Sequence, residues 1–244
     1  MDELEIFKNR ISSLINKAYN GNVCLLNFLD DAHLSIVKQF EKNLSGINIY
    51  YNGGIKNSDT MRVIISPYEV NDEDFKICIF KVIYNKKFYD INHRRVLGSL
   101  MGLGIKRECI GDIVIKDDVY FAVTKEISSY VKENLNYIGK ASIELEEVNY
   151  DIYNEINYDI KLDFVSSLRI DAIIAAAFNV SRNEAHEAIL EGLIYINHVL
   201  TLNPSENVKL LDEISYRGKG RSKLMEVGGL SKSGRIAVKL GRRI

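Results

Sequence analysis

Apolar positions in the first third of the chain change from a helical to a strand spacing. They first recur every three or four residues, which is typical of one face of an amphipathic helix. From about residue 47 they form short β-branched and aromatic runs around glycines, which is typical of a hairpin. The predicted elements are a helix at 4–18, a helix from Asp30 or Asp31 to Gly46, and strands at 47–51 and 61–66. An Asp side chain can cap the start of the second helix, and we expect residues 1–74 to form an α+β domain.

The middle of the chain has six segments in the order strand, helix, strand, strand, helix and strand. They are expected at 75–84, 92–103, 109–116, 119–123, 125–137 and 141–148. The first of these helices should turn Val96, Leu97, Leu100 and Met101 inward. This order is that of the ferredoxin-like β-α-β-β-α-β unit, which many RNA-recognition modules share with unrelated proteins. We expect such a domain over residues 75–150, in which only Tyr120 or Phe121 could stack on bases.

A third small domain is expected over residues 167–244. Residues 151–166 before it are polar and rich in tyrosine, and we interpret them as a connector that can include a strand in YDIKLDF. Two short helices then follow, the first opening at Arg169-Ile170-Asp171. The second opens at Ser181, which can form a capping box with Glu184. The predicted fold is therefore α+β, with three small domains.

Positive charge is concentrated at one end of a nearly neutral chain. The sequence has 32 Lys and Arg against 33 Asp and Glu, yet residues 217–244 hold nine cations and one acid, Glu226. Glycines between these cations let the backbone approach a nucleic-acid strand closely, and the cations can neutralise phosphates and release counterions. A turn is expected at Gly228-Gly229. The alternative is a solvated hairpin with a basic tail, which needs no partner.

Several motifs after residue 168 occur in the order typical of one RNA-binding module. The matching positions are Arg169, Ile170, Asp171, Ser181, Arg182, Ala185, Gly192, Ile194, Ile196, Asn197, Asp212 and Ile214. Together they resemble the module named after small-subunit ribosomal protein S-four, called the S-four module below. His198 and Leu211 depart from it, because the family has glycine at both positions. The resemblance implies that Arg169 and Arg182 contact RNA.

The start of the second helix of this module should favour a phosphate, because free amides and the helix dipole are positive there. The expected RNA-binding side chains are Arg169, Arg182, Asn183, His186, Arg217, Lys219, Arg221, Lys223, Lys232 and Arg235. A second basic patch is expected around the helix at 92–103, from His93, Arg94, Arg95, Lys106 and Arg107. For each of these residues the alternative is a solvated side chain on the surface.

The resemblance to a known family extends over most of the chain. The segments similar to the bacterial YlmH family are 28–37, 51–54, 92–113, 165–174, 217–224 and 228–236. This resemblance implies an N-terminal α+β domain, a central RNA-recognition-like domain and a terminal S-four module. It also implies association with the large ribosomal subunit, where such proteins are linked to stalled peptidyl-tRNA in quality control, and a genomic link to cell division. Arg95 departs from the family, which has an acid there.

Two other classes of function stay open. RNA-modifying enzymes also carry S-four modules, but Asp171 lacks the sequence that surrounds the catalytic Asp of pseudouridine synthases, and no methyltransferase-like glycine-rich turn precedes residue 167. The acidic N-terminal domain could instead make the chain a protein-interaction adaptor linked to cell division. The histidines have no sequence-linked nucleophile or metal partner. We favour a noncatalytic factor that binds rRNA and tRNA on the large subunit and needs no cofactor, metal or small-molecule substrate.

Other features of the sequence indicate a cytoplasmic protein. No apolar run approaches the roughly 20 residues of a membrane-spanning helix, and the acidic, amphipathic start lacks the pattern of a signal peptide. Cys24, Cys78 and Cys109 have no metal-ligand spacing, so we interpret them as reduced, buried thiols. The alternative, a reactive cysteine, would need a basic environment that the sequence does not clearly supply.

Overall fold

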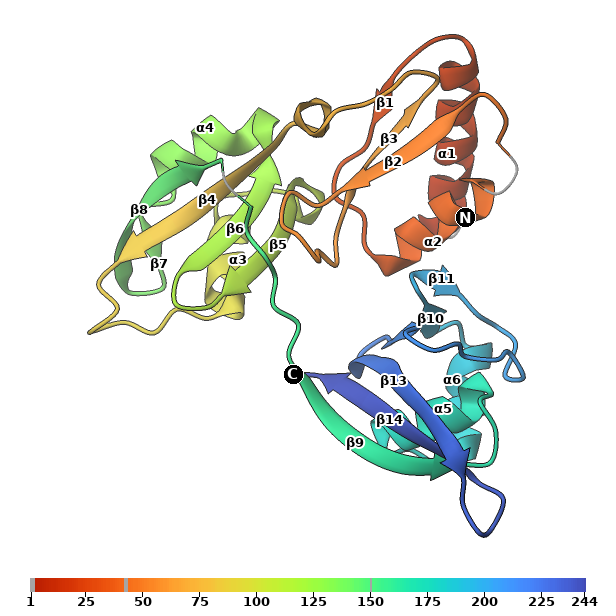
Figure 1. The fold of residues 1–244 in the computed structure, drawn as a ribbon. Coiled ribbons are helices and arrows are strands. Elements are labelled where there is room, and N and C mark those ends of the chain that lie inside the picture. The colour runs from red at the N-terminus through yellow and green to blue at the C-terminus, as the bar shows by residue number, and fades with distance from the viewer. Residues whose placement is uncertain (1–2, 42–43, 150) are drawn as a thin grey trace. The chain divides into compact units, whose positions relative to one another are not determined.

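The chain folds into two compact α+β units with three sheets (Figure 1). The structure, a computed structural model, describes residues 3–41, 44–149 and 151–244. The first unit holds the residues up to His33 together with Phe40–Glu155, and the second holds Leu34–Gln39 together with Ile156–Ile244. The α+β fold class predicted from the sequence is confirmed.

The N-terminal part has two helices and a three-stranded antiparallel sheet. These elements are α1 (Glu3–Tyr19), β1 (Cys24–Leu25), α2 (Asp31–Glu41), β2 (Asn48–Asn52) and β3 (Arg62–Ser66), with the strands in the order β1-β3-β2. The apolar stripe of α1 is buried, as predicted, and β2 and β3 form the predicted hairpin. Asp30 caps α2, since its Oδ1 accepts a hydrogen bond from the His33 amide at 3.1 Å. The predicted extension of α2 to Gly46 crosses residues 42–43, which lie outside the described residues.

The central part has the predicted order of elements with one short strand, β7 (Tyr137–Ile138), added. They are β4 (Ile77–Tyr84), α3 (His93–Gly102), β5 (Ile110–Ile115), β6 (Val119–Thr124), α4 (Lys125–Asn134), β7 (Tyr137–Ile138) and β8 (Ala141–Val148), with two 3-10 turns at Asp72–Phe75 and Arg107–Cys109. The strands form an antiparallel sheet in the order β5-β6-β4-β8-β7. Strand β4 therefore lies between β6 and β8, as in a ferredoxin-like unit. Strand β7 was not predicted, because the expected helix ended at 137 and α4 ends at Asn134.

The helices α3 and α4 cover one face of the central sheet. Phe80 and Phe121 from the strands pack there with Val96 and Leu100 from α3. The prediction that Met101 points inward is wrong, because this side chain is 43% exposed. Successive residues of a helix are rotated by about 100°, so Met101 lies off the face that Leu100 buries.

The opposite face of the central sheet is closed over much of its area. Phe28, Ile55 and Ile152 pack there against Val114 and Ala122 of the sheet, in an apolar cluster that the N-terminal and central parts share. The two parts are therefore held together by a common core within the first unit.

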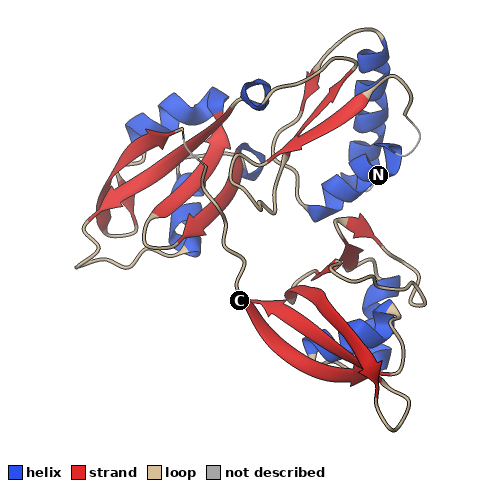
Figure 2. Ribbon diagram, viewed as in Figure 1, coloured by secondary structure: helices blue, strands red, loops and turns tan. Residues whose placement is uncertain are grey.

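The C-terminal unit is a six-stranded antiparallel sheet with two helices. Its elements are β9 (Tyr158–Val165), α5 (Ile170–Phe178), α6 (Arg182–Leu190), β10 (Ile194–Ile196), β11 (Val199–Leu200), β12 (Glu213–Tyr216), β13 (Gly220–Leu230) and β14 (Ile236–Arg243). The strand order is β11-β10-β12-β13-β14-β9. Figure 2 shows α5 and α6 on one face of β9, β14 and β13, where their apolar side chains form the core of this unit.

Two further predictions for this unit have different outcomes. The strand allowed for in YDIKLDF is present as β9, which pairs along its whole length with β14, so this part of the expected connector belongs to a sheet. The glycine-rich basic segment also forms strands, since β13 and β14 pair as a long hairpin. Gly228-Gly229 does not form the predicted turn. It lies within β13 at a shift in register between Val227 and Leu230, where a β-bulge takes up the extra residue.

The two residues that depart from the S-four pattern have a backbone conformation that glycine adopts readily. His198 has a φ of 64° and Leu211 a φ of 70°, both in the left-handed region. The turns of the module are therefore retained, although residues with a Cβ are strained in this conformation.

Leu211→Gly is expected to raise the free energy of unfolding by about 0.5–1 kcal/mol. The left-handed conformation costs an L-residue about 1–2 kcal/mol, and glycine removes this cost. Glycine also raises the entropy of the unfolded chain, which lowers the stability by only about 0.4–1 kcal/mol. Leu210→Gly is the matched control, because Leu210 is also exposed and is not among the described residues with positive φ. It should lower stability. Urea unfolding of both variants measures the difference, and a loss of stability in both would contradict the strain at Leu211.

Candidate nucleic-acid interface

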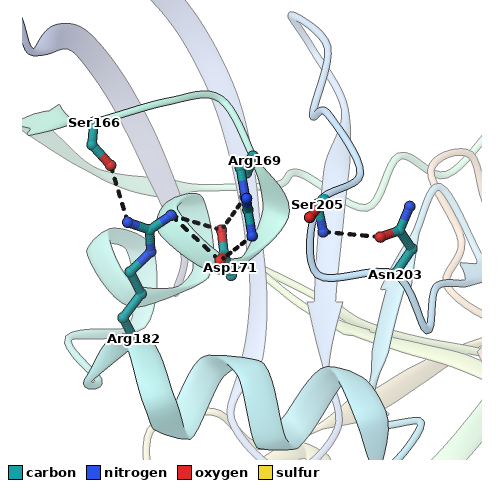
Figure 3. Close-up of polar contacts among 6 residues, drawn as sticks. All are labelled: Ser166, Arg169, Asp171, Arg182, Asn203 and Ser205. Carbon is teal, nitrogen blue, oxygen red and sulfur yellow. Dashed lines mark hydrogen bonds and ion pairs between the residues drawn. The ribbon is translucent and has the colours of Figure 1, made fainter.

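Two arginines share one buried carboxylate at the start of α5 (Figure 3). Arg169 donates to Asp171 from Nε at 3.3 Å and from Nη2 at 2.9 Å. Arg182 donates from Nη2 to both Asp171 oxygens, at 3.2 and 3.4 Å, and from Nη1 to Ser166 Oγ at 3.2 Å. Asp171 is only 4% exposed. These three residues, the Arg169–Asp171–Arg182 cluster, join the first turns of α5 and α6.

The local sequence explains why these helix starts meet. Asn179 ends α5 in the left-handed conformation, with a φ of 54°, and turns the chain sharply into α6. Ser181 caps α6 by accepting from the Glu184 amide at 3.1 Å, as predicted, which makes Arg182 the first residue of that helix. The Glu184 carboxylate of the expected capping box is bonded to Lys219 at 2.5 Å.

A turn at residues 203–206 supports the other helix. The Ile170 amide donates to the Glu206 carbonyl oxygen at 2.8 Å. The turn is closed by the Ser205 amide, which donates to Asn203 Oδ1 at 3.0 Å (Figure 3). The Val208 amide also donates to the Leu168 carbonyl oxygen at 2.9 Å, so backbone hydrogen bonds lie on both sides of Arg169 at the N-terminal end of α5.

The Arg169–Asp171–Arg182 cluster carries a net positive charge. Burial raises the pKa of Asp171, but hydrogen bonds from Arg169 and Arg182 outweigh this and hold the pKa below its ordinary value. The carboxylate is therefore ionised at neutral pH, and two guanidinium groups face one anion. Both arginine side chains remain partly exposed, and each guanidinium has five N–H donors. The cluster can present the remaining donors to a phosphate in a fixed geometry.

Arg235 is brought close to this cluster from a distant part of the sequence. It lines a hollow of about 300 Å³ together with Arg182, Ser166 and the small side chains Ala175 and Ala176 of α5. Asp163 also lines the hollow, and a hydrogen bond from Lys161 lowers the pKa of its carboxyl.

Not all of the other predicted RNA-binding residues of the C-terminal unit lie near the Arg169–Asp171–Arg182 cluster. Lys219 is bonded to Glu184, two residues beyond Arg182, and its ammonium lies 5.2 Å from the centre of the Tyr216 ring. Arg221 is largely buried and donates to Glu213 Oε1 at 2.7 Å. Asn183, His186 and Arg217 are exposed, Lys223 is half-buried, and Lys232 is exposed in the loop after β13.

The long hairpin divides these cations between its two ends. Strand β13 has 11 residues, so its ends lie about 30 Å apart at about 3.3 Å per residue. Arg221 and Lys223 lie at one end, and Lys232 follows the other. The structure thus brings together Arg169, Arg182 and Arg235, whereas carboxylates of the chain itself engage Lys219 and Arg221.

Sequence reasoning missed two cations that the fold places beside the helices. Arg242 of β14 donates to the Lys219 carbonyl oxygen at 3.1 Å and stacks 5.4 Å from the centre of the Phe178 ring. Lys161 of β9 donates to Asn179 Oδ1 at 2.9 Å, at the C-terminal end of α5. Asp171 and Ser166 were also not recognised as partners of the arginines, although the Arg-Ile-Asp motif contained the signal for Asp171.

The second basic patch is only partly assembled. Burial lowers the pKa of His93, the positive charge of Arg107 lowers it further, and the negative charge of Asp112 acts in the opposite direction. His93 and Arg107 therefore lie near each other. Arg107 donates to the Ile110 carbonyl oxygen and Arg95 to the Asp90 carbonyl oxygen. Arg94 and Lys106 are exposed.

The two aromatic residues expected to stack on bases do not form an open platform. Phe121 is completely buried on the helix-covered face of the sheet, so the prediction that it could stack is wrong. Tyr120 is half-buried against the shared apolar cluster, and Lys81 lies 6.0 Å from the centre of its ring.

Other chemistry has little support within the described part of the chain. In those residues, His, Cys, Asp and Glu form no group of three or more that could hold a metal ion. No helix there has the length and apolar character needed to cross a membrane. Burial raises the pKa of all three thiols, and that of Cys78 to about 12. They are therefore protonated at neutral pH.

Comparison with known proteins gives matches over both units. A family model named for an RNA-binding domain in YlmH matches residues 70–152, and the S4 domain model, which corresponds to the S-four module, matches 168–214. The chain is 31% identical over 224 residues to "Ribosome-associated protein quality control protein P2" of Bacillus subtilis, covering 90% of this chain and 87% of that protein. The solved structure "Cell division protein ylmH from Streptococcus pneumoniae" is similar in fold, with a TM-score of 0.52 and 23% identity over 61% of this chain and 93% of that one.

Proposed function

Because the chain belongs to the YlmH family, we propose that it is a noncatalytic protein that binds rRNA and tRNA on the large ribosomal subunit in quality control of translation. The name of the Bacillus subtilis relative describes a ribosome-associated quality-control protein. The family model over residues 70–152 is named for an RNA-binding domain. Such a factor acts in the cytoplasm, where ribosomes work.

The Arg169–Asp171–Arg182 cluster is the observation that carries this proposal. A buried carboxylate fixes two guanidinium groups before any ligand arrives, so little side-chain entropy is lost on binding. Guanidinium groups match the oxygens of a phosphate through paired hydrogen bonds. The first turn of α6 adds free amides and the positive end of the helix dipole at the same place.

The hollow beside Arg182 suggests how an RNA backbone runs over the module. Arg235 on its rim adds a third cation from the β13–β14 hairpin. The side chains of Ala175 and Ala176 are small, so they leave room on the surface of α5 between the cations. We place one phosphate at the Arg169–Asp171–Arg182 cluster and the next toward Arg235, with Lys232 farther along the same hairpin.

A noncatalytic role fits the state of the residues that could perform chemistry. The three thiols are protonated at neutral pH. Asp171, the only acid in the Arg-Ile-Asp motif, is engaged by two arginines and is not poised as a nucleophile toward an RNA base. Assays for methylation and pseudouridylation of ribosomal RNA should therefore give no turnover with the purified protein.

Replacing Lys232 and Arg235 with glutamine should flatten the salt dependence of binding to isolated large ribosomal subunits. Each lost phosphate contact lowers the slope of log K against log salt by about 0.7–0.9, so the expected decrease is about 1.5. Lys8→Gln combined with Arg10→Gln is the charge-matched control, since both residues are exposed on α1.

The salt series separates two ways in which this account can fail. A variant slope equal to that of the wild type would remove the end of the hairpin from the RNA contact. Wild-type protein that does not associate with large subunits at any salt concentration would overturn the proposed function itself.

A further inference from the structure

A pocket in the central part of the chain has the composition of a site for a nucleobase. It measures about 520 Å³ and lies between the loop after β4, the start of α3 and the turn between β7 and β8. Its lining residues include Phe88, Tyr89, Asp90, Arg95 and Lys140. It shares only Arg95 with the second basic patch predicted from the sequence.

Two consecutive aromatic side chains are exposed in this pocket. Phe88 is 70% exposed and Tyr89 is 40% exposed. Exposing one large apolar ring is ordinary on a protein surface, but two successive rings that line one pocket beside cations suggest a ligand. Aromatic side chains next to cations are the usual platform for unpaired bases, because every base has a flat π-face.

The polar groups around the rings suit a base better than a run of phosphates. Arg95 is fixed by its bond to the Asp90 carbonyl oxygen, which leaves the plane of its guanidinium available for stacking. Lys140 supplies a cation from the turn, and the Lys87 ammonium lies 5.8 Å from the centre of the Phe88 ring. Asp90 also lines the pocket, and its carboxylate would repel a phosphate but accept hydrogen bonds from the amino group of a base.

The covered sheet explains why RNA would be bound at this edge of the domain. RNA-recognition domains commonly stack bases on the open face of their sheet. Here Phe28, Ile55 and Ile152 occupy much of that face, and the neighbouring outer positions of β8 include the exposed acids Glu144 and Glu146. The aromatic pocket lies at the end of the domain where the loop after β4 meets the β7–β8 turn, away from that closed face.

We propose that this pocket binds one unpaired nucleobase of an RNA strand. The base stacks on the rings of Phe88 and Tyr89 beside the Arg95 guanidinium, Lys140 contacts the adjoining phosphate, and Asp90 accepts from the base. This site rests on the proposed function, since it gives the central part a defined role in holding RNA that the S-four module also binds.

A tryptophan at position 88 provides a direct test, because the chain contains no tryptophan. The fluorescence of full-length Phe88→Trp should be quenched by an RNA hairpin with an unpaired, adenosine-rich loop and not by a blunt duplex with the same stem. Tyr68→Trp is the matched control. Tyr68 is exposed in the same unit and does not line the pocket, so its replacement should respond to neither RNA.

Affinity measurements with two further variants distinguish stacking from charge. Phe88→Leu should weaken binding of the looped hairpin by about 5- to 150-fold, the range for loss of one stacked base, with no change in the salt slope. Phe88→Tyr keeps the ring and should bind like the wild type. Because Phe88 is mostly exposed, neither change should unfold the protein.

The outcomes separate this inference from the proposed function. If Phe88→Leu binds both the hairpin and large ribosomal subunits as the wild type does, and Phe88→Trp is not quenched, the nucleobase site is wrong while the role of the S-four module stands. Equal quenching by the blunt duplex would also overturn the site, since a paired base cannot enter the pocket. Absence of any wild-type association with large subunits would instead remove the proposed function.

Discussion

Arg169→Gln combined with Arg182→Gln is expected to weaken association with large ribosomal subunits by about 100-fold or more. The double change removes two charged hydrogen-bonding groups, each worth about 1.5–3 kcal/mol toward a phosphate, and each 1.4 kcal/mol is about tenfold in affinity. Each single change should cost less than half of the total. The arginine that remains keeps its bond to Asp171 and can still reach the same phosphate. Equilibrium binding at fixed salt concentration measures the effect.

Two controls keep this result interpretable. The double variant leaves Asp171 buried without a guanidinium partner, which destabilises the fold; adding Asp171→Asn restores a neutral cluster and should recover stability but not binding. Lys8→Gln with Lys132→Gln makes the same change in charge at exposed sites outside the C-terminal unit. A folded double variant that binds as tightly as the wild type would show that these arginines do not contact RNA.

Arg62→Ala should lower the free energy of unfolding of the first unit by about 1.5–4.5 kcal/mol, because it removes three hydrogen bonds of a buried guanidinium at about 0.5–1.5 kcal/mol each. Arg62 is 2% exposed in β3. It donates to the Leu26 carbonyl oxygen at 3.0 Å and to the Lys76 carbonyl oxygen at 2.8 Å, and it pairs with Glu126 of α4 at 3.2 Å. The variant leaves two carbonyl groups without this donor at the junction of the N-terminal and central parts.

Glu126→Gln is the matched control for this junction. Glu126 is 51% exposed, so its ion pair with Arg62 is screened by water, and its loss should cost less than about 1 kcal/mol. Urea unfolding of both variants gives the comparison. A loss below 1 kcal/mol for Arg62→Ala would mean that the guanidinium does not hold the two parts together.

Local apolar patterns were sufficient to predict most helices and the central sheet. The stripe of α1 and the order of elements from β4 to β8 depend on residues close in the sequence, and both were predicted. Strands β7 and β11 have two residues each, too few for any periodicity. Strand β9 was allowed for only as part of a connector. Its apolar side chains Ile160 and Leu162 are exposed, so their alternation with charged residues does not mark a buried face.

The candidate site depended more strongly on the three-dimensional fold. The Arg-Ile-Asp and Ser-Arg motifs identified Arg169 and Arg182 as candidates, because a short motif at the start of a helix also determines the local backbone geometry. The partners of the other cations are set by pairing between strands. Arg221 meets Glu213 because β12 and β13 pair in one register, and a list of charges along the sequence contains no information about that register.

The aromatic pocket could also not be predicted from the sequence, because the fold brings its residues together. Phe88 and Tyr89 belong to no periodic segment, and nothing near them in the sequence indicates a binding site. Arg95 and Lys140 reach them only because α3 and the β7–β8 turn meet at one end of the central sheet.

An electron-microscopy reconstruction of the full-length protein on a large ribosomal subunit tests the central claim most directly. It should show the start of α6 against ribosomal RNA, with the guanidinium groups of Arg169 and Arg182 within hydrogen-bond distance of phosphate oxygens. A particle in which the first unit makes the attachment, while Arg169 and Arg182 face solvent, would contradict the account.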